Sequence, residues 1–303
     1  FPDGLGSRDV LRADSIHRVE MPFELGLWNA RATPFVEGRF TAWDQGVDES
    51  KAPARLAAFA GVELGTTFWK RFGNGSIHAI APTLTLRGDL DIETTGGDPV
   101  RIDHVEDPLD GRVVELGVRS RWWKPQSEEH FDLDVRDAYA TDLPSGQREG
   151  FQPVSVLSEF LTFWGSVPIG FTHDGRYDLR EDETIYSRTF VGFEPAHDWG
   201  LEFGYHLGRD DGGSVLYEAA TFTTRYRATQ KWELEFEQSY SFSDSRGLGN
   251  TFLLRRIGHD FVMETEIGYR AGEGASFNIN LKPLFAWKRS SLGLIDRWLG
   301  VYH

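Results

Sequence analysis

The pattern that decides the fold class lies in Lys231–Phe242, which reads KWELEFEQSYSF. Along this stretch the large apolar side chains Trp232, Leu234 and Phe236 alternate with glutamates. Strict alternation places successive side chains on opposite faces of a β-strand, whereas an amphipathic helix requires apolar residues three and four positions apart. The stretch therefore predicts a strand with one apolar face and one charged face.

The same period of two recurs along most of the chain, for example in Trp199–Leu207, Phe261–Tyr269 and Phe277–Phe285. The chain is therefore predicted to be all-β. The predicted strands are 21–30, 31–43, 54–70, 77–92, 111–124, 129–139, 155–164, 168–178, 184–194, 198–208, 214–228, 231–243, 249–257, 260–270 and 274–287.

The length of these strands and their connections favour a membrane protein. Several strands of about 11–15 residues are long enough to cross a hydrocarbon core when tilted. Short turns such as 229–230 alternate with longer loops at 93–110 and 140–154, which we expect on the extracellular side, and aromatic residues gather near the strand ends. This pattern predicts an antiparallel transmembrane β-barrel of the outer-membrane type, with about 14–16 strands in this chain. A large soluble β-sandwich or β-solenoid is the alternative.

The predicted organisation has three parts: an N-terminal loop or truncated segment at 1–20, the transmembrane barrel at 21–287, and a C-terminal periplasmic tail at 288–303. The count of about fifteen strands is odd, whereas single-chain bacterial barrels usually have an even number. We therefore expect the chain to be a part of a larger barrel that lacks strands at its N-terminal side.

Composition excludes several classes of protein. With 32 Lys and Arg against 47 Asp and Glu, the net charge is −15, so nucleic acid is not an expected partner. No apolar run approaches the roughly 18 residues of a transmembrane helix. The chain contains no cysteine, which rules out disulfides, thiolate metal sites and a cysteine nucleophile.

No complete catalytic motif occurs in the sequence. Gly73–His78 begins like a dinucleotide-binding loop but lacks its final glycine and lies between two predicted strands, which favours a turn. The nine histidines show no metal-ligand spacing. We therefore expect no enzymatic activity, no cofactor and no metal, although a hydrolase embedded in a barrel is a further, weaker alternative.

The polar faces of the predicted strands give candidate residues that face a water-filled lumen. These residues are Arg119, Arg121, Glu202, His206, Glu233, Glu235, Glu264 and Glu266.

The last predicted strand carries two further features. Its apolar row, formed by Phe277, Ile279, Leu281 and Phe285, looks like the C-terminal strand that the barrel-insertion machinery recognises by pairing with a sheet edge. Pro283 cannot donate a hydrogen bond to the ladder, so this strand is also a candidate for a weak, laterally opening edge.

Several stretches, in order along residues 24–287, resemble the barrel domain of the LptD family of lipopolysaccharide-assembly outer-membrane proteins, also called organic-solvent-tolerance proteins. They are Glu24–Gly26 with Ala32–Thr41, which contains Thr-Pro-Phe-Val; Ile77–Leu84, with its His-x-x-x-Pro pattern; Asp103–Asp110 followed by Gly117–Trp122; Tyr226–Trp232; and Leu254–Tyr269.

This resemblance implies a barrel in the outer membrane of a Gram-negative type of cell that inserts lipopolysaccharide into the outer leaflet. The implied partners are lipopolysaccharide, a plug lipoprotein, periplasmic lipopolysaccharide-bridge proteins, the barrel-insertion machinery and outer-membrane lipid. The family's periplasmic jellyroll domain and about a third of its barrel strands have no counterpart in this sequence. A porin or a hydrophobic-solute channel is the alternative function.

Overall fold

The computed structural model describes residues 11–44, 52–96, 111–125, 127–142, 149–196, 198–209, 213–272 and 274–283. In these residues the protein is all-β, with eighteen strands in one large antiparallel sheet, so the predicted all-β class and antiparallel pairing are confirmed. No helix in the described part of the chain is long and apolar enough to span a membrane.

Fifteen of the strands have 9 to 19 residues, and three (β2, β5 and β9) have two to four. The strands are β1 (Arg12–Glu20), β2 (Phe23–Glu24), β3 (Arg31–Trp43), β4 (Ala54–Gly65), β5 (Phe68–Arg71), β6 (Ile77–Thr95), β7 (Arg112–Trp123), β8 (His130–Thr141), β9 (Gly150–Phe151), β10 (Val154–Trp164), β11 (Val167–Asp178), β12 (Glu183–Ala196), β13 (Trp199–Arg209), β14 (Val215–Thr229), β15 (Trp232–Ser241), β16 (Arg246–Ile257), β17 (Phe261–Arg270) and β18 (Gly274–Pro283).

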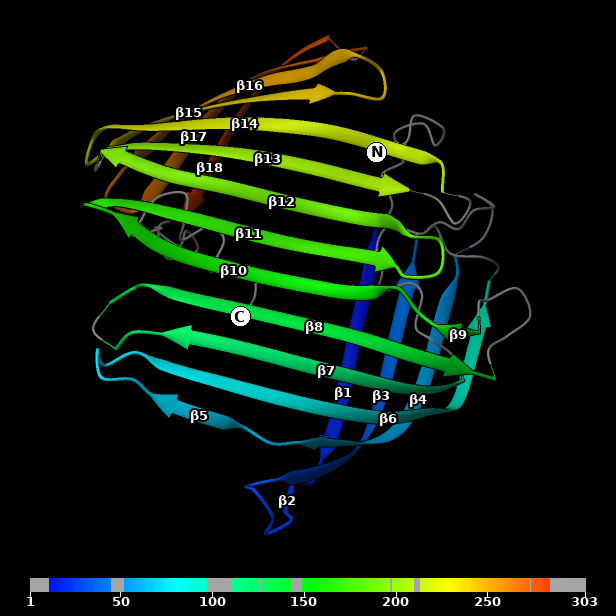
Figure 1. Ribbon diagram of the computed structural model, residues 1–303. Helices are drawn as coiled ribbons and strands as arrows, with labels where there is room; N and C mark the ends of the chain where they lie inside the picture. The colour runs from blue at the N-terminus through cyan, green and yellow to red at the C-terminus, as the bar shows by residue number, and fades with distance from the viewer. Residues whose placement is uncertain are drawn as a thin grey trace. The chain divides into compact units, whose positions relative to one another are not determined.

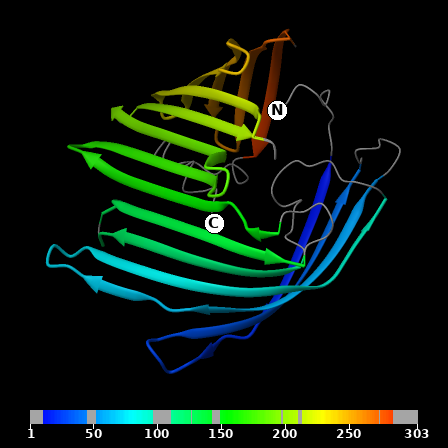
Figure 2. The ribbon, with the colours of Figure 1, turned by 45° about the vertical axis from the view of Figure 1, so that its right-hand side comes forward.

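The chain divides into two compact units. The first contains β1, β3, β4 and most of β6; β1, β3 and β4 lie side by side (Figures 1 and 2), and β4 also pairs with β6. The second contains β11 to β18, in which each strand pairs with the next along the chain, as β11 to β14 show in Figure 1. Short connections between consecutive antiparallel strands explain this simple order.

The structure corrects the prediction for the first thirty residues. Residues 12–20 are not a loop, because all nine residues of β1 pair with β3. Residues 21–30 are not a continuous strand: Pro22 has no N–H to donate, and only β2 pairs here. The chain then turns at Gly26, Trp28 and Asn29, which all have positive φ. Residues 1–10 lie outside the described residues.

Other boundaries also differ from the prediction. The predicted strand 54–70 is interrupted after Gly65 and continues as β5, while the strand predicted at 77–92 runs on to Thr95. The loop predicted at 140–154 contains β9, which pairs with Tyr139 and Ala140. Together with β1, these short pieces raise the number of strands from the predicted 14–16 to eighteen. Most of the loop predicted at 93–110 and the tail predicted at 288–303 lie outside the described residues.

The two faces of the strands carry opposite kinds of side chain. On one face, here called the polar face, buried residues include Glu37 of the first unit and Glu233, Glu235 and Glu264 of the second. On the other, the apolar face, large hydrophobic residues such as Phe203 are exposed. A water-soluble domain distributes these residue types the other way round.

The polar face of the first unit is packed tightly around Phe35. The Phe35 ring is 5% exposed, the guanidinium of Arg18 lies 4.0 Å from its centroid, and its register partner on β4 is Gly61. A Cβ on Gly61 would lie 2.6 Å from Cζ of Phe35 and would also clash with the carbonyl oxygen of Leu86. Only a residue without a side chain fits beneath this ring.

Replacing Gly61 by valine should therefore destabilise the folded protein by about 1–3 kcal/mol, the usual cost of overpacking a filled site. The matched control is Gly38 on β3, where nothing lies within 4 Å of an added Cβ. The urea midpoint of the protein folded in detergent should fall for Gly61→Val and stay near the wild-type value for Gly38→Val. Equal shifts for the two variants would contradict the packing described here.

Candidate functional site: a charge ladder across five strands

The charged residues at the end of the β14–β15 hairpin face one another because of its tight turn. Arg227 and Glu233 are register partners, as are Arg225 and Glu235 two residues further from the turn. Arg227 Nε lies 3.2 Å from Glu233 Oε1, and Arg225 Nη2 lies 3.1 Å from Glu235 Oε2. In the turn, the backbone N–H of Lys231 donates to the hydroxyl of Thr229.

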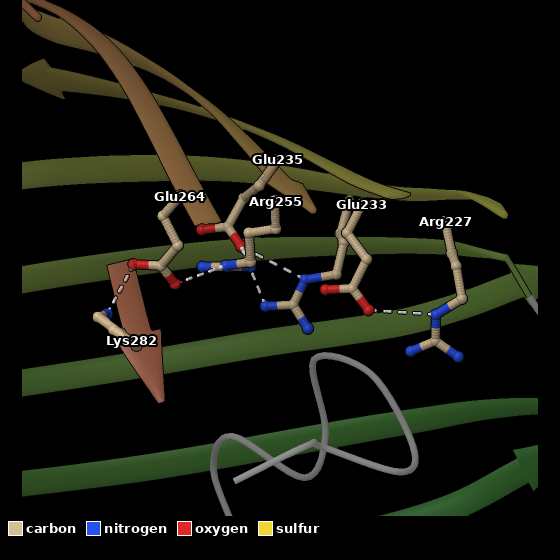
Figure 3. A network of polar contacts seen from close by, with 7 residues as sticks. Arg227, Glu233, Glu235, Arg255, Glu264 and Lys282 are labelled. Atoms are coloured by element: carbon tan, nitrogen blue, oxygen red, sulfur yellow. Dashed lines mark hydrogen bonds and ion pairs between the residues drawn. The ribbon is translucent and has the colours of Figure 1, made fainter. Parts of the chain in front are cut away.

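The charges continue across the next three strands and alternate in sign (Figure 3). Arg255 on β16 donates from Nη1 to Glu235 Oε2 at 2.9 Å and from Nε to Glu264 Oε1 at 3.2 Å. Lys282 Nζ on β18 lies 2.6 Å from Glu264 Oε2. We call Arg225, Glu235, Arg255, Glu264 and Lys282 the charge ladder; it contains one residue from each of β14 to β18.

The geometry of the ladder depends on the inter-strand register. Arg225 stands directly opposite Glu235, and Arg255 stands directly opposite Glu264. The other two contacts are diagonal, because the register partner of Glu235 on β16 is Leu253 and that of Glu264 on β18 is Asn280. Long side chains reach diagonal partners in an antiparallel sheet, so direct and diagonal pairs can join into one chain of contacts.

Four residues of the ladder are buried, with side chains that are 7–11% exposed: Arg225, Glu235, Arg255 and Glu264. Lys282 is 51% exposed at the β18 end. Buried charges need partners, and each carboxylate here contacts two cations. The ladder can therefore fix the register of five strands while it offers one accessible cation to an anionic group.

The first unit has a smaller network on its own polar face. Arg18 on β1 lies 3.1 Å from Glu20, 3.6 Å from Glu63 and 3.9 Å from Glu37, and Glu37 also accepts from Arg39. These residues come from β1, β3 and β4. None of these residues was among the predicted lumen-facing candidates, and Arg18 and Glu20 were predicted to lie in a loop.

The structure brings three of the lumen-facing candidates together: Glu233, Glu235 and Glu264 all contact the cations described above. Glu266 lies on the same face of β17, with Leu253 and Asn278 as register partners, but outside the ladder.

The other candidates lie elsewhere. Glu202 and His206 are on the polar face of β13, where the His206 ring meets that of Phe190 edge-on at 5.2 Å. Arg121 on β7 forms an ion pair with Asp132 at 2.8 Å, and Arg119 is exposed on the same strand.

Three residues of the predicted assembly signal lie on the apolar face of β18. Phe277, Ile279 and Leu281 are 62%, 60% and 65% exposed. Pro283 is the last described residue of the strand, opposite Phe261. Phe285 lies outside the described residues. Recognition of this row by the insertion machinery, and lateral opening at Pro283, stay predictions.

Sequence reasoning missed the cations that complete the ladder: Arg225, Arg255 and Lys282. A signal was present in the sequence, because Arg225 and Glu235, like Arg227 and Glu233, are equidistant from the turn at Gln230. Arg255 and Glu264 likewise flank the turn around Gly258 and His259. Opposite charges at equal distances from a tight turn become cross-strand neighbours in a hairpin.

In the described ranges, no group of three or more His, Asp or Glu side chains is arranged to hold a metal ion. A comparison of the chain with protein-family models and with curated proteins finds no match. The resemblance to the LptD family therefore remains a hypothesis that rests on the quoted sequence stretches.

Proposed function

We propose that this chain forms membrane-spanning strands of an outer-membrane β-barrel that passes lipopolysaccharide to the outer leaflet. The observation that carries the membrane part is the reversed distribution of side chains, with charged residues buried on one face and large hydrophobic residues exposed on the other. Exposed apolar side chains over a whole sheet face are unfavourable in water and favourable against lipid.

The dimensions of the apolar face support this proposal. On β17 the apolar face runs from Phe261 to Tyr269, with Met263, Thr265 and Ile267 between them. The eight steps from Phe261 to Tyr269 span about 27 Å along the strand, or about 20 Å across a membrane at a tilt of about 40°. Outer-membrane barrels have an apolar band of about 25 Å. The aromatic residues at the two ends fall where interfacial girdles are expected.

The polar face suits a hydrated lumen through which a polar head group moves. Its charges alternate in sign along the ladder, and Lys282 presents a half-exposed ammonium group. An acidic, sugar-rich head group needs such hydrated and hydrogen-bonding walls, since its phosphates cannot enter hydrocarbon. The sequence resemblance supports lipopolysaccharide as the transported lipid, with a plug lipoprotein, periplasmic bridge proteins and the barrel-insertion machinery as proposed partners in the outer membrane.

Two adjacent leucines on β16 give a sharp test of transport. Leu253 lies on the polar face opposite Glu235 and Glu266, whereas Leu254 lies on the apolar face opposite Leu234. A photo-crosslinking benzoylphenylalanine at position 253, in cells that make lipopolysaccharide, should become attached to lipopolysaccharide. The same residue at position 254 should become attached to bulk membrane lipid.

Stopping the supply of lipopolysaccharide should remove the adduct at position 253 and leave the lipid adduct at position 254. A lipid adduct at position 254 alone, together with leakage of small solutes from liposomes that contain the protein, would favour the porin alternative. Absence of lipid adducts at both positions would overturn the membrane assignment itself.

A further inference from the structure

On β15 to β18, one charged side chain breaks the pattern of the apolar face. On β15 to β18 this face consists of alternate residues in Trp232–Tyr240, Asn250–Arg256, Phe261–Tyr269 and Ala275–Pro283. Among these described positions no residue is acidic, and Arg256 is the one charged residue. The glutamates of β15 and β17 all lie on the polar face.

The surroundings of Arg256 differ sharply from those of its neighbour Arg255. Arg255 is buried on the polar face between Glu235 and Glu264. Arg256 is exposed, and its guanidinium lies 5.5 Å from the ring centroid of its register partner Trp232. On its other side the register partner is Met263. Within the described residues, no carboxylate pairs with Arg256.

An unpaired guanidinium in an apolar row is unfavourable unless an anion from outside the protein neutralises it. Arg256 lies two residues from the short β16–β17 turn, and Trp232 directly follows the short β14–β15 turn, so both lie at one rim. The cation–π contact with the Trp232 ring positions the guanidinium group while leaving its N–H groups able to bind a phosphate in a bidentate manner.

We propose that Arg256 and Trp232 form a binding site for the phosphate of a phospholipid head group at this rim. The inference rests on the proposed membrane function. It adds a specific lipid contact on the outside of the barrel, separate from the transported lipid. Short turns face the periplasm in outer-membrane barrels, so the phospholipid would belong to the inner (periplasmic) leaflet of the outer membrane. Arg256 lies two residues closer to this rim than Leu254, and its long side chain can extend to the head-group level, where arginine binds anionic lipid through charge and an aromatic ring is favourable.

The test uses the full chain folded in detergent micelles that contain pyrene-labelled phosphatidylglycerol, with energy transfer from tryptophan as the signal. Unlabelled phosphatidylglycerol should displace the labelled lipid, whereas diacylglycerol, which lacks the phosphate, should not. Arg256→Gln should weaken binding about fivefold, the value expected for one cation near a lipid surface. Arg246→Gln, at the opposite end of β16, is the matched control and should bind like the wild type.

Three outcomes would overturn the site. Arg256→Gln and Arg246→Gln could bind the labelled lipid equally well, or diacylglycerol could displace it as effectively as phosphatidylglycerol does. An excess of inorganic phosphate could also displace the labelled lipid, which would indicate a site for free anions. Heat-modifiable migration in gels and protease protection in liposomes must first be shown for each protein. Failure of the wild type in those assays would instead count against the membrane function.

Discussion

Replacing Arg255 by methionine should lower the free energy of unfolding by about 3 kcal/mol, because it removes the central cation of the charge ladder. Glu235 and Glu264 would each lose one of two cationic contacts while their side chains stay 7% and 9% exposed. Breaking a buried ion pair by removing one partner commonly costs about 3–5 kcal/mol, and the remaining contacts to Arg225 and Lys282 place the expected loss at the lower end. Urea unfolding of the protein in detergent, followed by tryptophan fluorescence, measures this loss.

The matched control is Arg246→Met on the same strand. Arg246 is 50% exposed and lies 3.6 Å from Asp244, so its loss should change the stability by less than about 0.5 kcal/mol. A double variant that adds Glu264→Gln to Arg255→Met should lose less than the two single variants together, because the two side chains interact. If Arg255→Met lowers the free energy of unfolding only slightly, and high salt abolishes the difference, then the ladder is already screened by water and ions. That result would contradict the burial of the ladder described here.

The second large effect concerns the two faces of β16. Arginine in place of Leu254 should reduce insertion into liposomes by an amount equivalent to about 2–4 kcal/mol, the cost of a cation on the lipid face near the middle of a bilayer. Arginine in place of Leu253 should insert normally, since its register partners are Glu235 and Glu266. The folded fraction, read from heat-modifiable migration in gels, measures both.

Leu253 and Leu254 are adjacent and both half-buried. The two variants therefore differ in the face of the strand that carries the arginine, while the residue replaced and its position along the strand are matched. A water-soluble sheet reverses the expectation: position 254 would then face solvent and accept arginine, while position 253 would be the sensitive one. That reversed result would contradict the membrane assignment without affecting the strand assignment.

The sequence by itself determined the all-β class and the faces of most strands. Alternation of side chains is a local property with a period of two, so it can be read along one strand without knowledge of its neighbours. Each predicted strand from residue 31 onward therefore has a counterpart in the structure. The same alternation assigned Glu233, Glu235 and Glu264 to the polar faces of their strands.

Local patterns failed where pairing or a turn overrides them. Residues 12–20 contain few apolar side chains, yet they form β1 because β3 supplies a complete pairing edge. Phe23, Leu25 and Leu27 alternate like a strand, but the positive φ of Gly26 turns the chain within that stretch. In the first case a strand distant in the sequence decides the structure, and in the second case the backbone conformation at Gly26 decides it.

Only the tertiary structure decided the diagonal contacts that join the pairs into a ladder. The contacts of Arg255 with Glu235 and of Lys282 with Glu264 are diagonal, and a shift of one residue in register would move either partner to the other face. Register is set jointly by turn geometry and by packing across all neighbouring strands, so no single stretch of sequence contains it. The contrast between a buried Arg255 and an exposed Arg256 in cation–π contact with Trp232 arises in the same way, because adjacent residues of one strand face different surroundings.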